Sequence, residues 1–324
     1  MEKGESVISI ALTALLVLIV LGIQRRWSGS TITNIASSAE NFVLQSTGIR
    51  GRIPQLAGYE TVRTYRLGNY SAALYRASPA PLVFASFRFV LYGTRGQPVF
   101  TRNSVEATTA PWTRLYDFAG RHGLPDPRKR GQPVYMRDLS GDGSPDLVLG
   151  QYSGGDHCCT AVTVIELKDG TASILGVIGG LDGLPFEGLE IHRLDRKTGW
   201  QLVVHRPYRT ACGSHPDAAD VVAVYAYDQG KFVDQTRGFP KFLDTTLQAN
   251  LAKWEREKNP SLHLLQTIAA DYSQAGRPAM ATQFFQENLP IFFPQLESNG
   301  ANPQACTEDV SNLIKNISSG KAGS

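Results

Sequence analysis

The stretch that determines how the middle of this chain folds is Asp-Leu-Ser-Gly-Asp-Gly-Ser-Pro-Asp-Leu-Val, residues 138–148. It places oxygen-bearing side chains at positions 1, 3, 5 and 9 of a loop, with glycine at position 6 for a sharp turn. Calcium prefers hard oxygen ligands at this kind of spacing. We therefore predict a calcium ion whose ligands are the side chains of Asp138, Ser140, Asp142 and Asp146 and the backbone carbonyl of Ser144.

The residues after this loop distinguish it from the calcium site of a helix-loop-helix motif. Such a site supplies a bidentate glutamate at position 12, whereas Leu149 stands there and a β-type run follows. The pattern favours a calcium loop inserted between strands. An Asp- and Gly-rich turn that holds no ion is the simpler alternative.

The loop resembles the calcium loop of FG-GAP and VCBS repeats, whose pattern is Asp-x-Asp/Asn-x-Asp-Gly-x-x-Asp before a strand. The continuation from Tyr152 to Thr160 contains Gly-Gly-Asp-His-Cys-Cys and is similar to a segment of a bacterial extracytoplasmic group. The resemblance covers roughly residues 80 to 235. It implies a binding or scaffold role in a propeller-like assembly and assigns no reaction. Ser140 replaces the usual Asp or Asn, which removes one charged ligand.

A possible second copy of the motif occupies residues 194–204, where Leu202 follows Leu147 by 55 residues. That separation suits one blade of a propeller. The copy lacks the carboxylates, so we expect it to hold no calcium.

Short runs rich in β-branched and aromatic residues, broken by turn residues, dominate the middle of the chain. They predict a mainly β domain over residues 58–240, either a sandwich or partial propeller-like sheets, with tight turns at Asp169-Gly170 and Gln229-Gly230. The predicted strands are 61–65, 72–75, 83–92, 98–101, 146–151, 161–167, 172–177, 201–205 and 221–227.

Helical spacing of apolar residues predicts an α-helical C-terminal region over residues 241–324. The predicted helices are 243–258, 262–275, 278–289 and 307–317. The second and third resemble one degenerate tetratricopeptide-type hairpin, which we expect to pack on the β domain or on a partner. An ordinary two-helix cap is the alternative.

The N-terminus carries a candidate membrane anchor. Residues 6–24 contain no charge and are long enough to cross a bilayer, and the residues that follow lack a signal-peptide cleavage pattern. We predict a transmembrane anchor over residues 1–27 and a stalk over residues 28–57. Arg25 and Arg26 favour a cytoplasmic body by the positive-inside rule, but the calcium-type loop and the cysteines favour an extracytoplasmic one. We therefore predict that the body of the protein is extracytoplasmic.

The charge pattern argues against a nucleic-acid partner. The 32 basic and 29 acidic residues are scattered and give a net charge of +3, too little for a sustained positive field. The one compact basic run, 128–130, lies between Pro127 and Gly131 and is typical of a solvated turn.

The chain contains four cysteines, and an even number outside the cytoplasm favours disulfides. We expect Cys212 to pair with Cys158 or Cys159, leaving Cys306 for the remaining neighbouring thiol or free. A soft metal site at residues 156–159, joined by His205 or His215, is the sharper alternative.

Together these features predict a single-pass membrane protein with its bulk in the periplasm or at the cell surface. We expect a calcium-binding β module that binds a protein or a surface glycan, or that has a structural role in the cell envelope. Nothing in the sequence requires an enzymatic activity. The alternative function is an envelope hydrolase with a site near His157 and Asp182.

Overall fold

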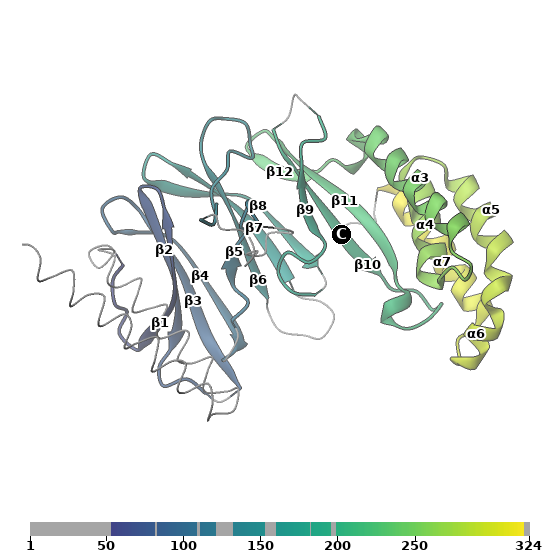
Figure 1. Cartoon of the computed structure of the whole chain (residues 1–324), viewed down its shortest axis with the longest axis horizontal. Helices are drawn as coiled ribbons and strands as arrows, with labels where there is room; N and C mark the ends of the chain where they lie inside the picture. Colours follow the sequence, from purple (N-terminus) through teal and green to yellow (C-terminus); the bar gives the residue numbers. More distant parts are fainter. Residues whose placement is uncertain are drawn as a thin grey trace, which may run out of the picture.

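A computed structural model describes residues 53–81, 83–108, 111–120, 132–152, 160–181, 183–195 and 199–320. These residues form three four-stranded antiparallel sheets followed by helices, which confirms the predicted mainly β fold with a helical C-terminal region (Figure 1). The predicted anchor at residues 1–27, and the stalk up to residue 52, lie outside the described residues. Across the described ranges, no helix has both the length and the apolar character needed to cross a membrane.

Each sheet is built from strands that follow one another along the chain, and neighbouring strands are antiparallel. The first sheet contains β1 (Tyr59–Leu67), β2 (Tyr70–Ala77), β3 (Phe84–Tyr92) and β4 (Pro98–Ala107). The second contains β5 (Arg114–Leu115), β6 (Asp146–Tyr152), β7 (Thr160–Lys168) and β8 (Thr171–Leu181). The third contains β9 (Leu189–His192), β10 (Gln201–Tyr208), β11 (Ala219–Asp228) and β12 (Lys231–Asp234).

The second sheet lies between the other two, so its strand β6 is buried on both faces. Side chains of a strand point alternately to opposite faces. Leu147 and Leu149 of β6 pack with the first sheet, whereas Val148 packs with Leu202 and Val204 of the third. This position explains why residues 147–149 of β6 are all apolar and do not alternate with polar residues.

The two predicted tight turns are confirmed and join β7 to β8 and β11 to β12. Asp169 and Gly170 both have positive φ, of 52° and 79°, and Gln229 and Gly230 have φ of 47° and 87°. Two consecutive residues with positive φ suit the twist of a two-residue hairpin, and Asp-Gly tolerates this backbone best.

The α-helices begin after the third sheet. They are α3 (Pro240–Arg256), α4 (Leu262–Gln274), α5 (Pro278–Asn288), α6 (Phe293–Ser298) and α7 (Pro303–Ser319). Short 3-10 turns are η2 (His215–Asp217), between β10 and β11, η3 (Thr236–Gly238), after β12, and η4 (Leu289–Phe292), between α5 and α6. The Ser261 hydroxyl accepts the Leu264 amide at 3.2 Å and caps α4. Gly276, with φ of 77°, ends that helix, and Pro278 starts the next.

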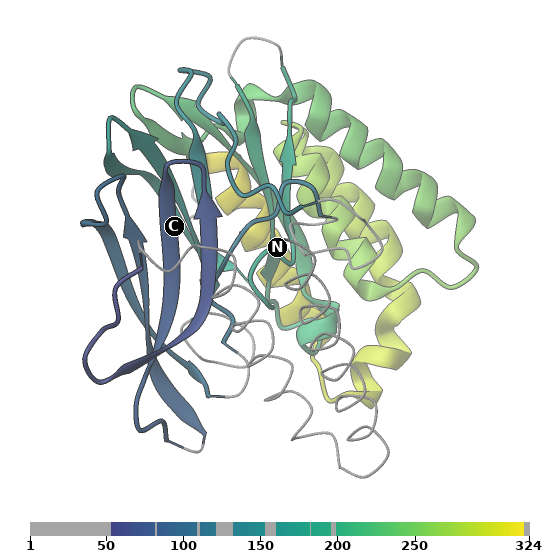
Figure 2. The same cartoon turned by 60° about the vertical axis from the view of Figure 1, so that its left-hand side comes forward.

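The helices cover the outer face of the third sheet, as both views show (Figures 1 and 2). α4 packs against both α5 and β11. Ala270 of α4 and Leu313 of α7 are fully buried with Ala219 and Val221 of β11. The predicted helix pair therefore packs on the β domain, one of the two expected arrangements.

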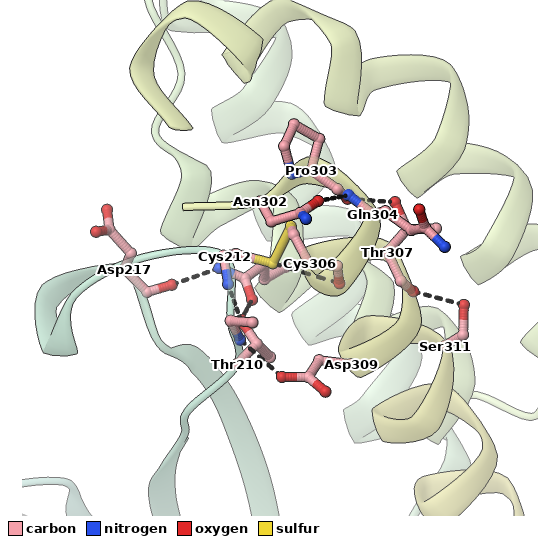
Figure 3. Close-up of a disulfide and its surroundings, with 12 residues drawn as sticks. Thr210, Cys212, Asp217, Asn302, Pro303, Gln304, Cys306, Thr307, Asp309 and Ser311 are labelled. Carbon is pink, nitrogen blue, oxygen red and sulfur yellow. Dashed lines mark hydrogen bonds between the residues drawn. A yellow bond between two sulfur atoms is a disulfide. The ribbon is translucent and has the colours of Figure 1, made fainter. Parts of the chain in front are cut away.

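A disulfide joins Cys212, which follows β10, to Cys306 in the first turn of α7 (Figure 3). The predicted pairing of Cys212 with Cys158 or Cys159 is wrong. The reason is the docking of α7 on the third sheet, which buries both sulfur-bearing residues in one core with Leu265 and Ile268. Cys158 and Cys159 lie outside the described residues.

Candidate calcium loop

The predicted ligands lie in one closed loop at the start of β6. Arg137 and Asp146 pair across its base, through N–H···O bonds of 3.0 and 2.8 Å between their backbones. Gly141 and Gly143 have φ of 83° and 89°, a left-handed conformation that favours glycine. The two glycines therefore let the loop turn back sharply over its own base.

Asp146 is the buried centre of this loop. It is 0% exposed, and its Oδ2 accepts the amides of Leu139 at 2.8 Å and Ser140 at 3.0 Å. Its Oδ1 is buried and finds no hydrogen-bond partner among the described residues. Burial raises the pKa of Asp146 to about 6, and the charges of Asp138 and Asp142 add to this effect. A buried carboxylate oxygen without a partner is costly unless a cation or donor satisfies it.

Asp138 and Asp142 surround that centre and organise the loop backbone. Asp138 accepts the Gly141 amide at 2.7 Å and the Gly143 amide at 3.0 Å. Asp142 accepts the Ser144 amide at 2.8 Å, and the Ser140 hydroxyl at 3.1 Å. The Ser144 amide lowers the pKa of Asp142 to about 2, helped by Lys168 and the Ser140 hydroxyl.

The donor set suits a hard cation. Four of the predicted ligands contribute side-chain oxygens, and Ser144 adds a carbonyl, which is the oxygen chemistry that calcium selects. Among the described residues, no three histidine, cysteine, aspartate or glutamate side chains are already arranged to hold a metal ion. Asp142 instead contacts a cation of the chain itself, because the Lys168 ammonium lies 3.2 Å from its Oδ2.

The loop is docked on the region predicted to be a second copy of the motif. The Trp200 amide donates to the Leu139 carbonyl at 2.9 Å. A Cβ on Gly199, whose φ is 66°, would lie 2.5 Å from the same carbonyl oxygen. The Arg137 guanidinium lies 4.5 Å from the centre of the Trp200 ring. The loop therefore bridges the second and third sheets.

Leu147 and Leu202, which define the spacing of the predicted repeat, occupy equivalent places. Each is the second residue of the second strand in its sheet, β6 or β10. The repeat interpretation stays a prediction, but its two halves fall on successive sheets in matching positions.

Sequence reasoning did not identify Glu166 and Lys168 as neighbours of the loop. Both come from β7, whose pairing with β6 places Glu166 directly opposite Asp146. Burial raises the pKa of the Glu166 carboxyl, and the charge of Asp142 adds to this effect. The alternating pattern of β7 predicts a strand, but the register that brings these residues to the loop is not visible in a single sequence.

The residues named for a hydrolase or a soft metal site are mostly outside the described ranges. These are His157 and Asp182, together with Asp156, Cys158 and Cys159. His205 and His215, considered for the soft metal site, share one cavity of about 320 Å³ with His263, Glu187 and Asp220.

His205 is held by an acidic partner in this cavity. Its Nδ1 lies 2.7 Å from Asp220 Oδ2, and this hydrogen bond raises the pKa of the imidazole. Among the described residues lining the cavity there is no serine, threonine, cysteine or lysine that could act as a nucleophile. The arrangement suits holding a proton on His205.

No protein-family model matches the chain, and no curated protein or solved structure is significantly similar to it. What the chain does must therefore be inferred from the chemistry of its own residues.

Proposed function

We propose that this chain is a calcium-binding β module, tethered to a membrane by residues 1–27, that binds a protein or surface glycan or supports an assembly at the cell envelope. The observation that carries the proposal is Asp146, whose carboxylate is fully buried inside an acidic loop with one oxygen unsatisfied within the described structure. Calcium would be held by Asp138, Ser140, Asp142 and Asp146 with the Ser144 carbonyl.

Calcium would act here by fixing the loop and not by chemistry on a substrate. The loop contacts Gly199 and Trp200 at the start of β10, so an ordered loop stabilises the interface between the second and third sheets. Successive four-stranded sheets that stack in this way support a partial propeller-like assembly, as the FG-GAP and VCBS resemblance implies. Such assemblies present binding surfaces on their connecting loops.

An extracytoplasmic location is part of the proposal. The Cys212–Cys306 disulfide supports it, because disulfides persist in oxidising compartments such as the periplasm and the cell surface. A calcium loop of modest affinity is also typical of modules that work outside the cell. Labelling of the protein in intact cells with a membrane-impermeant reagent tests the orientation, and labelling only after cell lysis would refute it.

Thermal unfolding of the full-length chain tests the calcium site. We expect millimolar calcium to raise the melting temperature relative to EDTA, because an ion that binds only the folded state adds RT ln(1 + [L]/Kd) to stability. At 100 times Kd this is about 2.7 kcal/mol. Magnesium at the same concentration should give a smaller rise.

Asp146→Asn gives the matched variant, with Asp228→Asn, on the exposed end of β11, as the control. The first should abolish the calcium-induced rise, and the second should retain it. In EDTA at pH 7 Asp146→Asn should be at least as stable as wild type, because the raised pKa of Asp146 means that its buried charge costs stability there. A wild-type melting temperature that is the same in EDTA and calcium would refute the proposal.

An envelope hydrolase remains the second candidate, favoured by the His205–Asp220 pair. The cavity that contains this pair is also lined by Gly183, the chain neighbour of Asp182. Hydrolysis of ester or glycoside probes that is lost in His205→Ala, with unchanged melting temperature, would support this candidate. Activity that survives the substitution would exclude a catalytic role for His205.

A further inference from the structure

The strand beside the calcium loop brings a fourth carboxylate to it. β7 is antiparallel to β6, and Glu166 stands directly opposite Asp146 in the register. Directly opposed residues point to the same face of a sheet, with Cβ atoms about 5 Å apart. The pairing extends into the loop, because the Leu167 amide donates to the Pro145 carbonyl at 2.9 Å.

Position 12 of the loop cannot contribute a ligand. Leu149 is 0% exposed and packs in the core between the first and second sheets, on the opposite face of β6 from Asp146 and Val148. A helix-loop-helix calcium site takes a bidentate glutamate from position 12, and this loop has no such ligand from its own chain segment. Ser140, at position 3, offers a neutral hydroxyl and adds no negative charge to the loop.

Glu166 and Lys168 are two residues apart in β7 and therefore share a face. The Lys168 ammonium lies 3.2 Å from Asp142 Oδ2, which shows that this face of β7 reaches the loop. Because Glu166 shares this face and stands opposite Asp146, it adds a negative charge beside the carboxylates of the loop, and like charges brought together are costly without a shared cation. The buried Oδ1 of Asp146, which has no hydrogen-bond partner among the described residues, independently favours a cation at the same loop.

We propose that Glu166 is a calcium ligand, supplied by the neighbouring strand in place of the position-12 glutamate, and that Lys168 is a competing internal cation which releases Asp142 when calcium binds. This inference rests on the proposed calcium site. It gives the two β7 residues opposite effects on affinity: Glu166 adds a charged oxygen ligand, whereas Lys168 occupies one of the loop's carboxylates.

Calcium titration calorimetry on the full-length protein separates these roles. Glu166→Gln should weaken the calcium Kd by roughly 10-fold or more, the range seen when a group that supports a metal site is lost. Lys168→Gln should tighten it by several-fold. Glu60→Gln, which removes the same charge from β1 in the first sheet, should leave the affinity unchanged.

Melting in EDTA distinguishes a ligand from a structural residue. With calcium removed, Glu166→Gln should melt at or above the wild-type temperature, because it relieves repulsion with Asp142. A purely structural Glu166 would lower the melting temperature equally with and without calcium. If Glu166→Gln folds poorly, Glu166→Asp serves as a second variant. It keeps the charge on a shorter side chain, and its calcium affinity should lie between those of wild type and Glu166→Gln.

The outcomes also separate this inference from the proposed function. Wild-type protein that binds no calcium, together with a Lys168→Gln variant that binds none, refutes the calcium site and this inference with it. Wild-type protein that binds calcium while Glu166→Gln binds it equally well refutes only the role of Glu166. Unchanged affinity in Lys168→Gln refutes the competition.

Discussion

Replacing Asp271 by asparagine should stabilise the protein above neutral pH and leave it almost unchanged in mild acid. Asp271 lies on α4, is 3% exposed, and accepts the side-chain amide of Asn250 from α3 at 2.7 Å. Burial raises the pKa of this carboxyl from 3.8 to about 7, with a further contribution from the charge of Asp220. Asparagine has nearly the same shape and carries no charge.

The sign of the effect follows from the two pKa values. Between about pH 4 and pH 7 the folded state keeps a proton that the unfolded state has already released, so the free energy of unfolding falls as pH rises. A difference of about three pKa units corresponds to about 4 kcal/mol, at about 1.4 kcal/mol per unit. Little of this is lost to solvent screening, because the side chain is almost fully buried.

Urea unfolding of the full-length chain in EDTA, from pH 4.5 to pH 8.5, measures this contribution. We expect Asp271→Asn to be more stable than wild type by about 2–4 kcal/mol at pH 8.5, and by less than about 1 kcal/mol at pH 4.5. The pKa of His205 is also raised, so its titration makes the free energy of unfolding of both proteins fall as pH rises near neutral pH. Asp228→Asn on the exposed end of β11 is the control.

A difference between Asp271→Asn and wild type that stays constant across this pH range would refute the reasoning. It would mean that the pKa of Asp271 is nearly the same in the folded and unfolded protein, so that both states release its proton together. The free energy of unfolding would then owe nothing to the titration of this group.

Two further substitutions test the cross-link and the loop contact. Replacing both Cys212 and Cys306 by alanine should lower the free energy of unfolding by about 5 kcal/mol, from the loop-closure entropy of a 94-residue separation, and a loss below about 1 kcal/mol in urea titration would contradict this. Gly199→Ala should lower the free energy of unfolding by about 1–3 kcal/mol, because its Cβ would meet the Leu139 carbonyl. Gly179→Ala, with open space around it, should lower it by less. Equal losses of stability in the two variants would exclude the contact as the cause.

Local patterns were sufficient to predict most of the regular structure. All nine predicted strands and all four predicted helices overlap observed elements, because their apolar spacing matches the faces that they bury. The sequence did not reveal β5, β9 or β12, which have two to four residues. A strand this short has too few side chains to show alternation and is defined mainly by hydrogen bonds to a longer neighbour.

The interactions that the sequence did not predict are those between distant segments. The loop residues Asp138 to Asp146 could be found because they are consecutive, whereas Glu166 reaches the loop only through strand register. The predicted disulfide partner of Cys212 was wrong for the same reason. The actual partner, 94 residues later in the sequence, reaches Cys212 only because of where α7 docks. Spacing along the chain contains no information about that docking.

The Cys212–Cys306 bond also sets the path that a mechanical load would take through the molecule. A chain held at one end and pulled at the other transmits tension from β10 directly into α7, through the sulfur atoms. The segment between them, which includes β11 and β12 as well as α3 to α6, is bypassed, and roughly 300 Å of extensible backbone is withheld from stretching. While the bond is intact, a load applied to the ends of the chain cannot stretch this segment.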